Sequence, residues 1–282
     1  AEERSALEKD LRDALVTGGL ELHYQPVVYA ATEKIVGFEA LMRWQHPTKG
    51  WMSPGKFIPI AEDAGLIDQM GQWALRKACE DLASWPESIR CAVNVSPLQF
   101  SNPELPNIVA NAIAHAGIAP SRLELEITES VFLNDGAGTD AMFKSLKRVG
   151  VRLALDDFGT GYSSLGYLKK APFDKIKIDQ SFVRGATEQG SRNGAIIASI
   201  TSLAEALSMD TTAEGVETLD ELALIQALGC SHVQGYIYYK PLNPEEASAL
   251  VSGDLAAEAE GPQAARSPRH VLLRRITVIF NG

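Results

Sequence analysis

The stretch VRLALDDFGTGYSSLGYLKKAPFDKIKID (151–179) decides the fold. Its two ends, VRLALDD and KIKID, read as β-strands, and the first of them finishes in a pair of acids followed by a glycine-rich loop. Helical patterns lie on either side of the stretch, near 138–149 and 190–208. Strands that alternate with helices favour a parallel sheet covered by those helices.

The same alternation extends in both directions along the chain. β-like runs are expected near 20–28, 35–44, 91–95, 123–127, 151–157, 175–179, 210–216 and 232–236. Helices are expected near 1–17, 54–64, 67–84, 104–116, 138–149, 190–208 and 218–228. About eight strands in this arrangement predict an α/β protein with a TIM-type (β/α)8 barrel. The first two strands have no helix between them, so we expect a modified barrel in which one strand is antiparallel.

The chain divides into one large domain and a tail. A length of 282 residues suits a single α/β barrel, and we assign residues 1–250 to it, with 1–18 as a lead-in helix. Residues 251–282 begin as a linker-like segment rich in Ala, Gly and Pro and end in the β-like run VLLRRITVIF (271–280). That run either docks on the barrel or begins a further unit, and we favour docking.

Composition excludes several classes of function. A net charge of −10 and a sequence pI near 5.1 argue against DNA or RNA polymers as partners. The three scattered cysteines form neither a disulfide framework nor a zinc motif, and are expected to be buried thiols. No apolar run approaches the roughly 20 residues that span a bilayer. We therefore expect a cytoplasmic chain without direct membrane insertion, or the cytoplasmic part of a membrane-anchored parent.

Acidic residues recur at or near the carboxyl ends of the expected strands. Six carboxylates and one amide fall there: Glu39, Asn94, Glu126, Asp156, Asp157, Glu214 and Glu217. Each alone has an ordinary explanation, such as a solvated strand face, a turn or a helix cap. In a parallel barrel, however, these strand ends converge on one mouth. Together the side chains would repel one another unless they bound one or two hard divalent cations.

One lysine also stands out in this pattern. In KIKID (175–179), strand alternation places Lys177 on the face opposite Ile176 and Ile178. A lysine that faces the barrel interior could orient a water molecule or neutralise a phosphate. The alternative is a surface lysine on the outer face of the strand.

Eight sequence blocks in order are similar to one known family. They are YQPVV (24–28), EALMRW (39–44), NVSPLQF (94–100), LELEITES (123–130), DDFGTGYSSL (156–165), KIKIDQSFV (175–183), AEGVET (213–218) and GCSHVQGYIYYKPL (229–242). The chain resembles the EAL domain of cyclic di-GMP phosphodiesterases over about residues 5–250. The resemblance implies hydrolysis of cyclic di-GMP, a bacterial second messenger, to linear pGpG.

The resemblance also implies a role for each matching position. Metal ligands would be Glu39, Asn94, Glu126, Asp156, Asp157 and Glu214. Catalytic positions would be Glu39, Asp157, Lys177 and Glu214, with Lys177 orienting the attacking water. Substrate contacts would come from Gln25, Arg43, Asp179, Glu217 and Gln234, with Arg43 on phosphate. Glu129 would hold the loop DDFGTGYSSL in its productive form.

Cofactor and partners follow from the same resemblance. Carboxylate and amide ligands suit Mg²⁺ or Mn²⁺, and the family uses these metals, with two ions expected in each site. The partners would be cyclic di-GMP, a second copy of the chain in a homodimer, and regulatory domains of a longer parent protein. Members of the family can also lose catalysis and keep ligand binding. A catalytically silent cyclic di-GMP receptor is therefore the alternative.

Overall fold

The computed structural model describes residues 2–133, 136–161, 165–169 and 171–252. The expected tail lies outside these residues from position 253 onward, so the docking of 271–280 stays a prediction. The strands are β1 (Leu20–Tyr29), β2 (Lys34–His46), β3 (Gly50–Met52), β4 (Arg90–Val95), β5 (Leu123–Thr128), β6 (Arg152–Phe158), β7 (Lys175–Ile178), β8 (Asp210–Ala213) and β9 (His232–Val233).

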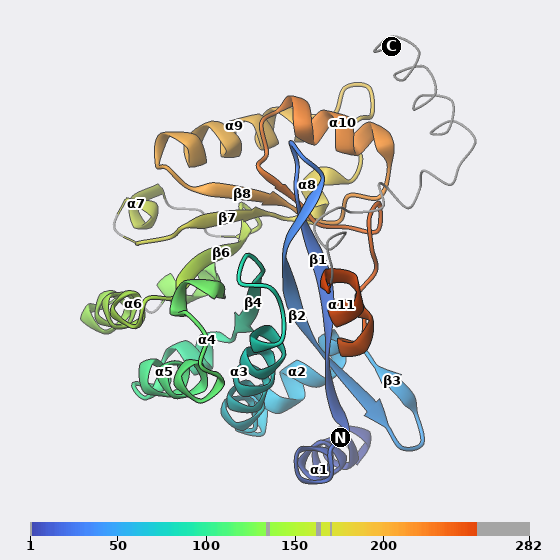
Figure 1. The fold of residues 1–282 in the computed structure, drawn as a ribbon, viewed down its shortest axis with the longest axis vertical. Helices are drawn as coiled ribbons and strands as arrows, with labels where there is room; N and C mark the ends of the chain where they lie inside the picture. Colours follow the sequence, from blue (N-terminus) through green and yellow to red (C-terminus); the bar gives the residue numbers. More distant parts are fainter. Residues whose placement is uncertain (1, 134–135, 162–164, 170, 253–282) are drawn as a thin grey trace.

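Helices surround these strands on the outside (Figure 1). The longer ones are α1 (Glu2–Thr17), α2 (Pro54–Asp63), α3 (Ile67–Ala83), α5 (Leu105–Ala116), α6 (Ala137–Val149), α9 (Asn193–Ala206), α10 (Leu219–Ala227) and α11 (Pro244–Val251). Short turns of helix are α4 (Pro97–Phe100), η1 (Pro120–Arg122), η2 (Glu129–Phe132), α7 (Leu165–Leu168) and α8 (Gln180–Val183).

The sheet closes on itself as a barrel. Its strand order is β1-β9-β8-β7-β6-β5-β4-β2, with β3 extending β2 at the edge and β1 pairing back onto β2. β1 runs antiparallel to both of its neighbours, while β2 and β4 through β9 form parallel pairs. The predicted modified barrel with one antiparallel strand is therefore confirmed. The absence of a helix between the first two strands was the correct signal, because a short turn can join only antiparallel neighbours.

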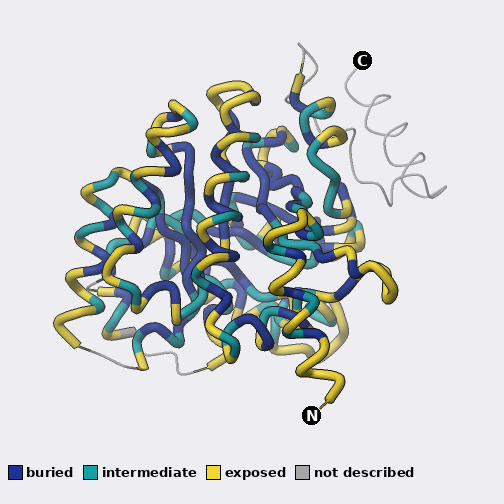
Figure 2. Tube along the Cα trace, turned by 90° about the horizontal axis from the view of Figure 1, so that it is seen from below, coloured by how far each residue is buried: buried dark blue, intermediate teal, exposed yellow. Residues whose placement is uncertain are grey.

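Two apolar clusters hold the helices against the barrel. The larger one lies between the strands and α3, α5, α6, α9 and α10. The inner part of the fold is mostly buried, and exposed residues lie mainly along the outside (Figure 2). The smaller one joins α1 and α2 to the β2–β3 hairpin through Leu11, Trp44 and Phe57. Cys79, Cys91 and Cys230 are free and buried, as expected.

The structure adds elements that we did not predict from the sequence. β3 forms a short hairpin with the end of β2, and α11 lies against β1. The start of α11 was recognisable in the sequence, because Asn243 and Glu246 form a capping box and Pro244 is the first helical residue. Among the described residues, no helix is both long enough and apolar enough to cross a membrane.

Candidate active site

Most of the predicted acidic residues meet at the carboxyl ends of the parallel strands, whereas Glu217 is exposed at the edge of the site and lies 3.4 Å from Arg184. Glu39 comes from β2, Asn94 from β4, Glu126 from β5 and Asp156 from β6, while Glu214 follows β8 directly. Strand pairing brings them together, since Asn94 stands opposite Glu126 in the β4–β5 register. The Nδ2 atom of Asn94 donates a 2.9 Å hydrogen bond to Oε1 of Glu39.

Lys177 lies in the middle of these carboxylates. Its side chain is buried, with a relative exposure of 1% for the residue. Its Nζ atom is 2.6 Å from Glu126, 2.7 Å from Glu214, 3.3 Å from Glu39 and 3.7 Å from Asp156. The inward orientation expected from KIKID is therefore what the structure has, and the surface-lysine alternative is wrong.

Burial and charge act in opposite directions on these carboxyl groups. Burial alone would raise the pKa of Glu39, but Lys177 and hydrogen bonds from Gln234 and Asn94 outweigh it and lower the pKa. Burial, followed by the charge of Glu39, raises the pKa of Glu126 well above its ordinary value. Burial also raises the pKa of Glu214, which Lys177 only partly offsets. The cluster holds more negative charge than one ammonium group neutralises.

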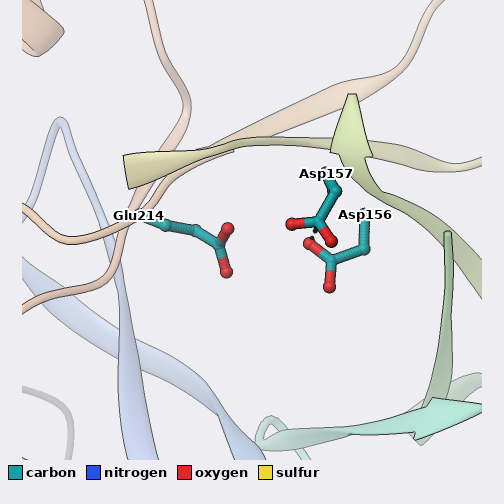
Figure 3. A group of neighbouring side chains, drawn as sticks. All are labelled: Asp156, Asp157 and Glu214. Atoms are coloured by element: carbon teal, nitrogen blue, oxygen red, sulfur yellow. Dashed lines mark hydrogen bonds between the residues drawn. The ribbon is translucent and has the colours of Figure 1, made fainter. Parts of the chain in front are cut away.

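Three of the acids form a compact group on one side of the mouth. Asp156, Asp157 and Glu214 each present a carboxylate oxygen, and these oxygens lie within 4.8 Å of one another (Figure 3). Asp157 has a φ of 56°, an unusual conformation that turns its side chain toward the other two. Burial and Asp156 raise the pKa of Asp157 to about 6. Such a set of hard oxygen ligands could hold a divalent metal ion.

Glu129 connects the end of β5 to the loop that follows β6. It is buried in η2, and its Oε1 accepts a 2.8 Å hydrogen bond from the backbone N–H of Gly159. Gly159 has a φ of 89°, which favours glycine at that position. The carboxylate therefore fixes the first residues of the glycine-rich loop, immediately after Asp157.

An open polar groove of about 330 Å³ borders the acids. Of the expected substrate contacts, Gln25, Asp179, Glu217 and Gln234 line it. Arg43 stands two residues beyond the groove residue Leu41 on β2, with its guanidinium donating to the carbonyl of Met42. The groove also has wall residues that we did not predict: Leu41, Gln180, Arg184, Gly215, Gly235 and Tyr236.

Two glutamines in the groove are connected to the acids. Gln234 is 4% exposed, and its Nε2 donates to Oε2 of Glu39 at 2.6 Å and to Oε1 of Gln25 at 3.0 Å. Gln25 in turn donates to the carbonyl of Tyr239. Sequence reasoning gave both residues a substrate role only. The link to Glu39 joins residues far apart in the chain, and no sequence pattern indicated it.

A second cavity of about 330 Å³ adjoins the acids on the side of α2 and α3. Its walls are mainly apolar and include Leu22, Met42, Ile58 and Ile67, together with the polar side chain of Glu62. The only available sequence signal was the run PGKFIPIAED (54–63), which we interpreted simply as a helix. This cavity was therefore missed.

Comparisons with known proteins agree with this geometry. The sequence profile of the EAL domain matches residues 8–241. An uncharacterised signalling protein of Caulobacter vibrioides is 44% identical over 94% of this chain and 33% of its own length. The bifunctional diguanylate cyclase/cyclic di-GMP phosphodiesterase MucR of Pseudomonas aeruginosa is 40% identical over 89% of this chain and 37% of its own length.

Comparison with a solved structure supports the same family. The PaMucR phosphodiesterase in complex with c-di-GMP superposes with a TM-score of 0.82 at 40% identity, covering 86% of this chain and 99% of that one. The chain spans about a third of the length of the curated relatives it matches. The family profile covers most of the chain, and the barrel has the fold that the sequence blocks implied. The chain belongs to the EAL domain family.

Proposed function

We propose that this chain is a metal-dependent phosphodiesterase that hydrolyses cyclic di-GMP to linear pGpG. One observation carries the proposal: Lys177 and the carboxylates of Glu39, Glu126, Asp156 and Glu214 meet at the edge of a polar groove. The relatives named as cyclic di-GMP phosphodiesterases support the choice of substrate.

The donor set fits two divalent ions. Glu39, Asn94, Glu126 and Asp156 offer oxygen ligands on one side, and Asp156, Asp157 and Glu214 offer them on the other. These hard ligands favour Mg²⁺ or Mn²⁺ over zinc. When bound, the ions would supply an activated water and would stabilise the leaving oxygen of an in-line displacement.

Side chains of the protein would orient the attacking water and bind the substrate. Hydrolysis forms a bond from phosphorus to the water oxygen and breaks the bond to the leaving 3′-oxygen, which takes up a proton. The ammonium of Lys177 would orient the attacking water by a hydrogen bond, because its Nζ carries three donors. Arg43 would contact a phosphate, and Gln25, Asp179, Glu217 and Gln234 would line the groove around the nucleotide.

Glu129 would act through the loop after β6. Its hydrogen bond to Gly159 holds the backbone beside Asp157. Replacing Glu129 with Ala should therefore reduce turnover more than it reduces Mn²⁺ affinity. Equal losses of both would show that Glu129 acts on the metal ligands and not on the loop.

The test is turnover of cyclic di-GMP by purified chain, with Mg²⁺ or Mn²⁺ against EDTA, and products separated by chromatography. We expect metal-dependent pGpG from the wild type, none from Asp156→Asn, and wild-type rates from Asp140→Asn. Asp140 is an exposed acid on α6 and is a matched control for the loss of one charge. Tight binding without product would identify a receptor, and neither binding nor product would reject the substrate.

We also propose that the chain forms a homodimer and acts within a longer protein that carries regulatory domains. The longer parent protein is supported by the relatives, which are about three times as long as their match to this chain, whereas the homodimer is inferred from the resemblance alone. Light scattering on the purified chain tests the dimer. A mass of one chain at all concentrations tested would reject it.

A further inference from the structure

A small, partly open chamber lies next to the acidic residues and is lined by residues of the barrel strands. It has a volume of about 30 Å³ and lies between Glu126, Lys177 and Gln234 on one side and Glu124, Lys175 and His232 on the other. Thr212 of β8 also lines it. Strand pairing fixes that position, since Thr212 stands opposite Lys177 on β7 and opposite His232 on β9. The hydroxyl of Thr212 is thus a polar group next to the site with no role in the reaction above.

Two polar atoms of residues that line the chamber lack hydrogen-bond partners among the described residues. They are Oγ1 of Thr212 and Oε1 of Gln234. Both residues are almost inaccessible, at 1% and 4% relative exposure. Buried polar groups in native proteins almost always have a partner, in the protein or in an ordered water. Two such atoms on residues that line the same cavity point to an occupant that satisfies both.

The polar groups of the residues that line the chamber indicate which kind of molecule could occupy it. The carbonyl oxygen of Gln234 requires a donor, while the hydroxyl of Thr212 can donate or accept. Two lysine–carboxylate pairs on the walls are already formed, Lys175 with Glu124 at 2.8 Å and Lys177 with Glu126 at 2.6 Å, and the remaining charged residue of the lining, Arg90, is exposed. Neither a cation nor an anion would gain from entering between them. A water needs about 15 Å³ of such space and several polar neighbours, and the chamber provides both.

We propose that a buried water bridges Thr212 Oγ1 and Gln234 Oε1, and that Thr212 is a positioning residue for Glu39 acting through Gln234. This inference rests on the proposed metal-dependent site, of which Glu39 is a ligand. It assigns a role to a threonine that the mechanism leaves unused.

The orientation of the Gln234 amide explains how such a water acts on the site. Gln234 directs both Nε2 hydrogens away from the chamber, to Glu39 Oε2 at 2.6 Å and to Gln25 Oε1 at 3.0 Å. A half-turn of the amide would set its carbonyl oxygen against the carboxylate of Glu39. A water that donates to Oε1 favours the observed orientation. It therefore keeps one oxygen of Glu39 fixed while the other accepts from Asn94.

The first test is a high-resolution crystal structure of the wild-type chain. We expect an ordered water within hydrogen-bond distance of both Thr212 Oγ1 and Gln234 Oε1. A chamber without density, or a Gln234 amide turned to bond Thr212 directly, would overturn the proposal. This result depends neither on activity nor on the folding of a variant.

The second test is Mn²⁺ affinity by calorimetry on the full chain, without substrate. Thr212→Val removes the hydroxyl at nearly constant volume and should weaken binding about tenfold, the lower end for partners outside the ligand shell. Thr212→Ser keeps the hydroxyl and should bind Mn²⁺ as the wild type does. Unchanged affinity in Thr212→Val would overturn the positioning role.

Thr211→Val is the matched control. Thr211 is the neighbouring buried residue of β8, and its hydroxyl accepts from the Ser231 N–H away from the chamber. This variant should lose thermal stability but keep its Mn²⁺ affinity. If Thr211→Val weakens Mn²⁺ as much as Thr212→Val does, the effect belongs to the strand and the proposal fails. A wild-type chain that binds Mn²⁺ but does not hydrolyse cyclic di-GMP would reject the proposed function alone.

Discussion

The ammonium of Lys177 lies between 2.6 and 3.7 Å from carboxylates that four different strands deliver. Removing one partner from a buried charge cluster costs more stability than the net value of the pair, because the other charges stay behind unpaired. For this site the remaining charges are all negative. Their mutual repulsion would be relieved by any cation that replaced the ammonium.

Lys177→Met should therefore have an effect on stability that depends on metal. In EDTA we expect a loss of about 3–5 kcal/mol in the free energy of unfolding, measured by urea denaturation. Saturating Mg²⁺ should restore most of it, while turnover stays lost. Lys147→Met, which removes a partly exposed ion pair with Asp174, should cost less than about 1 kcal/mol in both conditions. Equal losses with and without Mg²⁺ would show that the lysine does not balance the acidic cluster.

His232 gives a second prediction at this scale, on pH. Burial, followed by the charge of Lys175, lowers the pKa of His232 from 6.5 to about 4. The folded state thus prefers the neutral ring, and acid favours the unfolded chain, which takes up a proton first. The contribution of the neutral His232 ring to the free energy of unfolding is fully present above pH 6.5 and is lost as the pH falls from 6.5 to 4. It amounts to about 1.4 kcal/mol for each unit by which the pKa of His232 is lowered.

Urea unfolding at intervals between pH 7 and 4 measures this loss. His232→Gln should show a shallower fall in stability over that window than the wild type. His115→Gln, at an exposed position on α5, should follow the wild-type curve. A His232→Gln curve parallel to the wild type would mean that other groups cause the acid instability.

The side of the barrel on which a side chain lies was predictable where alternation along a single strand decides it. KIKID placed Lys177 inside the barrel because Ile176 and Ile178 needed the apolar outer layer. The bonds from Gln234 to Gln25 and Glu39 were not predictable in the same way. They depend on how β9 and β1 meet, which is a property of barrel closure and not of either segment alone.

Elements were predictable where the hydrophobic period was long and regular. The helices near 67–84 and 104–116 have the expected type and nearly the expected ends. The strand expected at 232–236 is reduced to His232–Val233, because the chain turns at Gly235 to pack on the loop after β8. That turn depends on a tertiary contact with Val216. Such a contact produces no hydrophobic periodicity that could be recognised in the sequence.

The turn at Gly235 can be tested directly. A Cβ added at Gly235 would collide with backbone atoms of Val216, which cannot yield as a flexible side chain would. Gly235→Ala should therefore destabilise the chain by about 1–3 kcal/mol and lower Mn²⁺ affinity, because Gln234 moves with its neighbour. Thermal denaturation and calorimetry measure the two effects.

Gly138→Ala is the control for this substitution. Gly138 lies in α6 with open space around its Cα, and alanine is the better helix former, so stability should stay level or rise by up to about 1 kcal/mol. A Gly235→Ala variant as stable as wild type would show that the segments around Gly235 and Val216 can move apart without a loss of stability.

For the whole molecule, closure of the barrel depends on the antiparallel β1. Ten residue pairs join β1 to β2, whereas only two join it to β9. The long hairpin thus carries Gln25 and Glu39 on adjacent strands, where they face each other in register. Count and alternation of strands predicted the barrel, but the short pairings of two residue pairs on either side of β9 required coordinates. The seam between β1 and β9 is bridged by the Gln25–Gln234 bond, at the edge of the acidic cluster.

The acidic mouth should therefore make the stability of the entire barrel depend on metal. The chain carries a net charge of −10, and part of that charge is gathered at one end of the barrel, where burial opposes its ionised form. An ion that binds only the folded state stabilises it by mass action, by about 2.7 kcal/mol at a concentration one hundred times its dissociation constant. For a domain of this size that corresponds to a rise of about 5–10 °C in Tm. We expect this rise for wild type titrated with Mn²⁺ at constant ionic strength, and little of it for Asp156→Asn, whereas Asp140→Asn should behave as wild type. A rise of the same size in Asp156→Asn would mean that Mn²⁺ acts on the general surface charge, and the ring of acids would then have to be explained without a metal.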